Sequence, residues 1–245
     1  MNFVPVRALM HRAFCVAAVA TIAVAASASP ARAQGGGGGA DMQARMMELK
    51  ESMAKNKAAL ATYTWKETTT ISLKGEVKKV QHYQVREGSD GKPQKTSLDP
   101  AQAPQQPQGG RLKQRVVAKK KEEFEDYAEK MKTTAGMYVP PDKDLIQAAY
   151  QKGNVAFAPD GGDVKITFTN YVKPGDSMTI LFDKAKKQIS SISIKTYMDD
   201  PSDGLTLNVT FDSLPDGTSH VSSTTVDGQS KELVVASVNG DYQKL

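Results

Sequence analysis

The fold class is decided by a short stretch in the last third of the chain, LTLNVTFD, residues Leu205–Asp212. Apolar residues occupy every second position from Leu205 to Phe211, and Thr, Asn and Asp fill the positions between and after them. Successive side chains of a strand point to opposite faces of a sheet. The alternation therefore predicts a half-buried β-strand.

The same alternation recurs on both sides of this stretch. It covers Val164–Phe168, Met178–Phe182 and Ile192–Thr196, and more weakly Ser219–Val226 and Lys231–Val238. Turn signals such as Lys173-Pro174-Gly175-Asp176 and Pro215-Asp216-Gly217-Thr218 separate these segments. The connections are too short for parallel crossovers, so an antiparallel meander is expected. Its apolar face must be covered by other elements.

The N-terminus is typical of a secretory signal. Arg7 and Arg12 precede an apolar run, Ala13–Ala26, which is too short to span a membrane as a helix. The small-x-small site Ala31-Arg32-Ala33 predicts that residues 1–33 are removed near Ala33 and that the protein is exported to the periplasm. Lipoprotein processing at Cys15 is the alternative, but Cys15 lies inside the apolar run.

Removal of the signal changes the charge and the available chemistry. The chain has 32 basic and 27 acidic residues, and the signal contains three arginines, so 29 basic residues remain and the net charge is +2. A strongly positive net charge would be the main indication of nucleic-acid binding, and the exported chain does not have one. The one cysteine lies in the signal, so the exported chain has no disulfide and no thiolate metal site.

The segments upstream of the sheet alternate between helical and extended patterns. Residues 34–40 form a glycine-rich spacer, and 41–60 repeat apolar residues at helical spacing. Tyr63–Leu73 and Glu76–Glu87 predict a hairpin. A Pro/Gln/Gly-rich loop is expected over 89–110, and a helical insertion over 111–152. One domain is expected over 41–245.

The first helix of the insertion, 111–134, has an uneven charge pattern. Arg111–Lys121 holds six basic residues and no acid, and Glu122–Glu129 holds five acids. Such adjacent runs are typical of a solvated helix with close ion pairs. The alternative is a contact surface for an anionic partner.

Few residues suggest catalysis or metal binding. His82 and His220 lie in separate candidate strands without ligand spacing, and no phosphate loop, dinucleotide-binding glycine pattern or nucleophile elbow occurs. The acidic turn Asp199–Gly204 lacks the pattern of a calcium loop. We therefore expect no enzyme activity, no catalytic residues, no metal and no cofactor.

The order of these elements resembles the LolA/LolB-like superfamily of periplasmic lipoprotein carriers. The shared features are an export signal, an N-terminal amphipathic helix, the opening hairpin, a central helical insertion and the long antiparallel run. The resemblance implies an α+β fold in which a strongly curved antiparallel sheet, an incomplete barrel, is covered by the N-terminal helix and the insertion. It also implies a cavity for acyl chains. The first strand offers no arginine that matches the family's gating position, so the family's binding residues do not transfer.

The leading hypothesis is a non-enzymatic envelope protein that binds a lipid or lipoprotein acyl chain. The expected lining is the apolar face of the strands, namely Trp65, Ile166, Phe168, Ile180, Phe182, Ile194, Leu207, Val209 and Phe211. The expected lid is Met46, Leu49 and Met53. The alternative is an interaction or sensor module with a filled core, whose contact surface is the charged helix 111–134. An envelope hydrolase is a third possibility, but no nucleophile, base or metal set supports it. We expect neither nucleic-acid binding nor a membrane span.

Overall fold

The computed structural model describes residues 54–88, 92–100 and 111–245, and the side chains of 111–113 are outside that description. The expected signal peptide 1–33 and spacer 34–40 lie outside the described residues. Residues 54–60, at the end of the helix expected over 41–60, are helical. The expected lid residues Met46, Leu49 and Met53 also lie outside the described residues.

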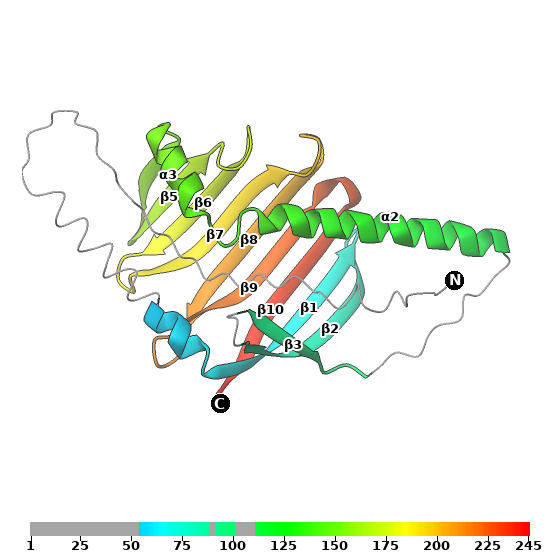
Figure 1. Cartoon of the computed structure of the whole chain (residues 1–245), viewed down its shortest axis with the longest axis horizontal. Helices are drawn as coiled ribbons and strands as arrows, with labels where there is room; N and C mark the ends of the chain where they lie inside the picture. Colours follow the sequence, from blue (N-terminus) through cyan, green and yellow to red (C-terminus); the bar gives the residue numbers. More distant parts are fainter. Residues whose placement is uncertain (1–53, 89–91, 101–110) are drawn as a thin grey trace, which may run out of the picture.

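Ten strands form one antiparallel sheet in the order β3-β2-β1-β10-β9-β8-β7-β6-β5-β4 (Figure 1). The strands are β1 Tyr63–Leu73, β2 Glu76–Glu87, β3 Pro93–Ser97, β4 Val155–Asp160, β5 Asp163–Thr169, β6 Ser177–Asp183, β7 Gln188–Tyr197, β8 Gly204–Ser213, β9 Ser219–Gly228 and β10 Leu233–Lys244. The first hairpin joins the C-terminal meander through the β1–β10 pair. Because β3 and β4 end the sheet and do not pair, the sheet stays open, which confirms the α+β, incomplete-barrel prediction.

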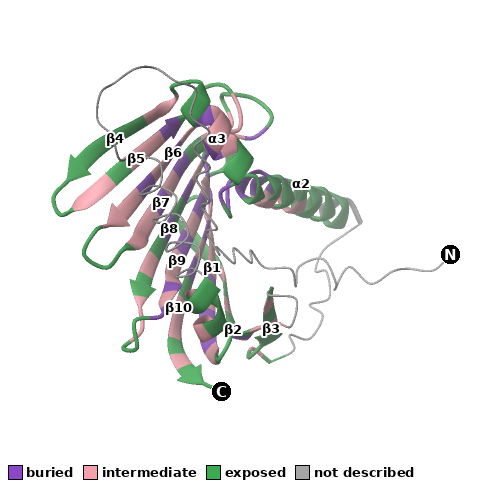
Figure 2. Cartoon of the chain, turned by 60° about the vertical axis from the view of Figure 1, so that its left-hand side comes forward, coloured by how far each residue is buried: buried purple, intermediate pink, exposed green. Residues whose placement is uncertain are grey.

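Two helices lie on one face of this curved sheet, which we call the inner face (Figure 2). Helix α2 spans Arg111–Gly136 and α3 spans Lys143–Gln151. The main core forms where they meet the sheet, and it contains Tyr127, Met131 and Ala135 of α2 and Ile146 and Ala149 of α3. The insertion is therefore helical and covers the apolar face, as expected.

The stretch that opened the sequence analysis is central in the sheet. Leu205, Leu207 and Val209 of β8 are fully buried, whereas Asn208 and Thr210 are exposed. The burial alternates with period two, as the sequence pattern predicts. Strand β8 pairs with β7 on one side and β9 on the other, so both of its edges are hydrogen-bonded.

Helix α2 approaches the sheet most closely at Gly228, the last residue of β9. A Cβ atom at this position would lie 2.7 Å from both Met131 Sδ and Tyr127 Oη. A glycine is therefore required where the helix crosses the strand, because any larger residue would displace the two side chains of the core.

A buried carboxylate ties the two-helix insertion to the sheet. Asp176 accepts hydrogen bonds from Tyr138 Oη at 2.5 Å, Tyr171 N at 2.5 Å, and Val172 N and Lys173 N at 2.9 Å each. Tyr138 ends the α2 segment, and Tyr171–Asp176 connects β5 to β6. Burial raises the pKa of Tyr138, and it raises the pKa of Tyr171 to about 12, so both hydroxyls remain donors at neutral pH.

Two strands were not anticipated. Strand β3 lies inside the segment 89–110 that was expected to be a loop, where it pairs with β2 through five residue pairs, from Pro93 to Ser97. Strand β4 pairs with β5 along the opposite edge and contains Pro159, a residue that sheets accept at edges. Both strands lie at the edges of the sheet and are held by backbone hydrogen bonds to one neighbour. Their side chains therefore need not alternate between apolar and polar, and the sequence pattern does not reveal them.

Phe211 lies on the inner face but is only partly buried, whereas the sequence predicts a buried residue. We expect Phe211→Ala to lower the free energy of unfolding by about 2 kcal/mol, since partial burial reduces both the transfer and the cavity contribution. Leu207→Ala, at a fully buried position of the same strand, should cost about 2–5 kcal/mol. Urea unfolding of both variants checks the order, and a larger loss for Phe211→Ala would contradict this assignment of burial.

Candidate functional site

The inner face carries one continuous row of apolar side chains across half of the sheet. Directly opposite residues of antiparallel strands share a face. The register places Phe157, Ile166, Ile180, Ile192 and Val209 in such a row, from the edge strand β4 to β8. Burial rises along the row, because Phe157 is 63% exposed whereas Ile192 and Val209 are fully buried beneath the helices. The apolar surface thus extends beyond the area that α2 and α3 cover.

The same row changes character in the other half of the sheet. It continues through Thr224 of β9, Ser237 of β10 and Thr69 of β1, which are all buried. The hydroxyls of Thr69 and Ser237 are 2.9 Å apart, and Thr69 Oγ1 donates to Glu67 Oε1 at 2.9 Å. This row is therefore apolar toward β4 and hydrogen-bonding toward β1, whereas the neighbouring row stays apolar through Val226 and Val235 to Ile71 of β1.

A buried ion pair lies at the polar end of this face. Lys95 Nζ of β3 is 2.5 Å from Glu67 Oε1 of β1, and each side chain retains 7% of its exposure. Lys95 Nζ also lies 5.6 Å from the centroid of the Tyr83 ring. A charge removed from water needs a partner of this kind, because an isolated buried charge is very costly.

Aromatic rings surround the ion pair. Trp65, Tyr83 and Val85 form a second buried cluster, separate from the main core, against which Tyr242 packs. Trp65 and Tyr242 stack with their ring centroids 5.4 Å apart, and His220 lies 4.2 Å from Tyr242. Burial, with the charge of Glu67 as a smaller cause, raises the pKa of Tyr242, so its hydroxyl stays neutral.

One polar atom beside the ion pair has no partner among the described residues. Asn239 pairs with Glu67 in the β1–β10 register, and its Nδ2 donates to Val221 O at 2.9 Å. Its Oδ1 is buried and accepts no hydrogen bond from the described part of the chain. A buried acceptor without a donor is rare in proteins. A donor group of a ligand would satisfy it.

The residues nominated from the sequence fall into three groups. Those buried beneath the helices in the main core are Phe168, Ile180, Ile194, Leu207 and Val209. Those on the inner face but only partly buried are Ile166, Phe182 and Phe211. Trp65 is separated from both groups, because it belongs to the second cluster at the polar end. Sequence reasoning missed Glu67, Lys95 and Asn239 as site residues, since no local pattern shows that β3 folds back beside β1.

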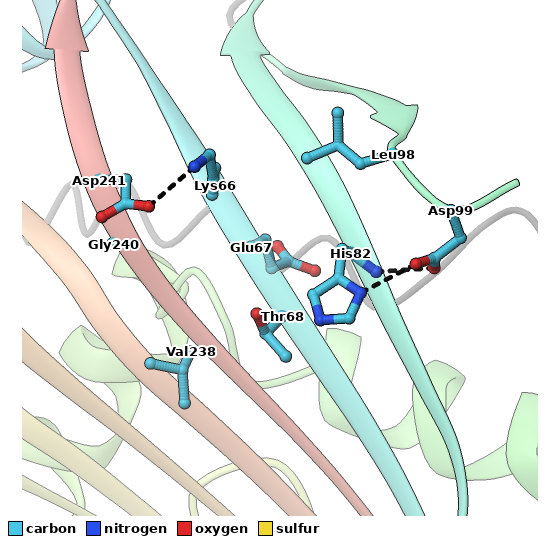
Figure 3. A pocket seen from close by; sticks show the side chains of 9 residues that line it. All are labelled: Lys66, Glu67, Thr68, His82, Leu98, Asp99, Val238, Gly240 and Asp241. Carbon is cyan, nitrogen blue, oxygen red and sulfur yellow. Dashed lines mark hydrogen bonds and ion pairs between the residues drawn. The ribbon is translucent and has the colours of Figure 1, made fainter.

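A pocket of about 520 Å³ lies among β1, β2, β10 and the residues after β3, where the exposed side chains of the opposite, outer face gather (Figure 3). It is lined by Lys66, Glu67, Thr68, His82, Leu98, Asp99, Val238, Gly240 and Asp241. None of the nominated lining residues is among them. The lining mixes apolar and charged side chains, and the Lys66–Asp241 ion pair and the hydrogen-bonded His82–Asp99 pair lie in it, so it does not resemble a site for an acyl chain.

The pocket's geometry is set by contacts that hold the chain after β3. Asp99 accepts from the backbone N–H of His82 at 2.9 Å, and its other oxygen lies 2.8 Å from His82 Nδ1. These hydrogen bonds lower the pKa of Asp99, so it remains ionised at neutral pH. Lys66 Nζ pairs with Asp241 Oδ2 at 3.1 Å on the opposite wall. Both pairs serve to fix the chain, and neither is placed as a nucleophile with its base.

Among the described residues, no three His, Cys, Asp or Glu side chains are grouped as they would be around a metal ion. No helix in the described part of the chain has the length and apolar character that a membrane span requires.

Solved structures that resemble this chain include three proteins. A DUF1329 family protein from Desulfovibrio piger is 12% identical, with a TM-score of 0.39 and coverage of 83% of this chain and 90% of that one. A LolA superfamily protein from Nitrosomonas europaea is 10% identical, with a TM-score of 0.35 and coverage of 80% and 93%. A proposed outer membrane lipoprotein-sorting protein domain from Vibrio parahaemolyticus is 8% identical, with a TM-score of 0.38 and coverage of 81% and 91%.

No protein-family model and no curated protein matches the chain. The function is therefore argued from the residues of this chain.

Proposed function

We propose that this chain is a non-catalytic binding protein of the periplasm that holds a lipid or lipoprotein acyl chain against the inner face of its sheet. The observation that carries the proposal is the row that runs from buried Val209 to exposed Phe157. Phe157 is 63% exposed, and through Ile166 its apolar surface is continuous with the core, so it forms part of a patch and is not an isolated exposed residue. An apolar ligand on this surface would complete the core.

The uncovered β4 end of the inner face suits an amphiphile. An acyl chain along Phe157, Ile166 and Phe182 loses contact with water, which is worth about 0.8 kcal/mol per buried CH₂ before the costs of association. The polar group attached to that chain stays at the exposed β4 edge, because β4 and β1 are seven strands apart in the sheet and the helix-covered core lies between Phe157 and Glu67. The lid assigned to Met46, Leu49 and Met53 remains part of the proposal.

The test is titration of the exported, delipidated protein with a fluorescent fatty acid. We expect saturable binding, and we expect Phe157→Asp to weaken it about tenfold, because a polar group would replace a contact worth about 1.5 kcal/mol or more. The matched control is Val238→Asp, on the outer face of β10, where Val238 is 57% exposed. Both variants should unfold at the temperature of the unaltered protein.

The outcomes separate the proposal from its alternative. Saturable uptake that Phe157→Asp alone weakens supports the carrier function. Absence of saturable uptake by the unaltered protein would exclude it. Equal loss in the two variants would show that the fatty acid binds to exposed apolar residues without regard to face.

A second candidate function is an envelope interaction module, and a specific observation favours it. Beneath α2 and α3 the core is filled, because Ile180, Ile194 and Leu207 pack directly against the helices and are 0–2% exposed. In that function, the protein would bind no acyl chain and would use its surface alone. Native mass spectrometry of protein purified without detergent distinguishes the two, since only the carrier retains a lipid.

A further inference from the structure

The N-terminal half of α2 extends away from the core of the described structure. Every residue from Gln114 to Glu123 is exposed, and contact with the core begins only at Phe124 and Tyr127. Figure 1 shows this half of the helix extending past the strands. Packing against the core therefore accounts for the apolar residues in the second half of the helix. It does not account for the residues of the first half.

The projecting half, which we call the basic arm, carries an excess of positive charge, four described cations against the two acids Glu122 and Glu123 at its end. Its described cations are Arg115, Lys119, Lys120 and Lys121. The sequence pattern favours a helix laced with close ion pairs between the basic run and the acidic run 122–129. In the described part of α2, a single pair joins them, Lys121 to Glu125 at 3.6 Å. Arg115, Lys119 and Lys120 form no ion pair in the described structure.

The order of charges along α2 does not serve helix stability. The helix has no acidic residue in its first turn and no basic residue in its last turn. The helix dipole places positive potential at the N-terminus, so cations are disfavoured there and favoured at the other end. Since the observed order is the reverse of the stabilising one, the basic arm is explained better by an external partner of negative charge.

We propose that the basic arm docks the protein on an anionic lipid surface. Lysine supplies three of its four described cations, and protein–protein interfaces are depleted of lysine, whereas polybasic segments bind anionic headgroups. Val116 and Val117 lie among these cations and are 55% and 58% exposed. Apolar residues interleaved with lysines suit the headgroup boundary of a membrane. The docking does not require the inner face to hold a ligand.

The probe is a sedimentation assay with vesicles of phosphatidylcholine alone or with about a third phosphatidylglycerol. We expect the full exported chain to bind only the anionic vesicles, and to be released when salt is raised until the Debye length falls to a few ångströms, at about 0.5 M. The triple variant Arg115→Glu/Lys119→Glu/Lys120→Glu should bind about a hundredfold more weakly, since three cations are lost and each contributes about fivefold.

The matched control reverses three exposed lysines elsewhere, Lys165→Glu/Lys184→Glu/Lys186→Glu, and has the same net charge as the arm variant. It should keep anionic-vesicle binding within about twofold, because electrostatic attraction acts only within about a Debye length of the surface. Acids near a helix N-terminus are favourable, so the arm variant should unfold at the same temperature as the unaltered protein or higher.

Three results would overturn the docking proposal. They are no binding of the unaltered chain to anionic vesicles, equal loss in both triple variants, and full binding by the arm variant. The first result would favour an acidic protein as the partner of the arm. The fatty-acid titration is run on the same arm variant, and unchanged uptake there separates a failure of docking from a failure of the carrier function.

Discussion

Replacement of Asp176 by alanine is expected to lower the free energy of unfolding by about 3–5 kcal/mol, a large part of the stability of a domain. The carboxylate is 2% exposed and accepts four hydrogen bonds, from Tyr138 and from three consecutive backbone N–H groups. The variant leaves three backbone N–H groups without this acceptor, and each such group costs about 1–3 kcal/mol, whereas Tyr138 Oη keeps Thr196 Oγ1 at 2.6 Å as a partner. Urea unfolding, followed by circular dichroism, measures the loss.

Two further variants define the origin of this loss. Tyr138→Phe removes one of the four donors and should cost about 1–2 kcal/mol, because the carboxylate keeps its backbone partners. Asp212→Ala alters an exposed carboxylate of β8 and should change stability by less than about 0.5 kcal/mol. If Asp176→Ala were no more destabilising than Asp212→Ala, the carboxylate would not be what holds the insertion to the sheet.

Replacement of Lys95 by methionine is the second change with a large expected effect, a loss of about 3–5 kcal/mol. Methionine preserves most of the side-chain volume, so packing changes little. Glu67 then keeps only the Thr69 hydroxyl as a described partner for a charge that is 7% exposed. The measurement is again the free energy of unfolding, at neutral pH.

The double variant Lys95→Met/Glu67→Gln tests whether the loss comes from the unpaired charge. It should be more stable than Lys95→Met alone, because the amide has no charge to desolvate and can still accept from Thr69. Additive losses would mean that the two side chains do not interact. Lys66 and Asp241 form an exposed ion pair between β1 and β10, and replacing both should cost less than about 1 kcal/mol.

Much of the fold was determined by patterns that are local in the sequence. Alternation in Leu205–Asp212 and its neighbours predicts the strands correctly, because period two is a property of the backbone itself. Asp142 caps α3, since its Oδ1 accepts from the backbone N–H groups of Asp144 and Leu145, a contact between residues that are close in the sequence. The strands β1 and β2 of the first hairpin also have the predicted bounds, because their pattern is likewise local in the sequence.

The site depended on contacts between distant segments, which only the tertiary structure decided. Lys95 lies in a segment whose composition indicates a loop, and its role arises from pairing of β3 with β2, which carries it to Glu67. Apolar strand residues look alike in the sequence whether a helix covers them or not. Phe211 is partly exposed and Leu207 fully buried because α2 and α3 cover one end of the inner face and leave the other end uncovered.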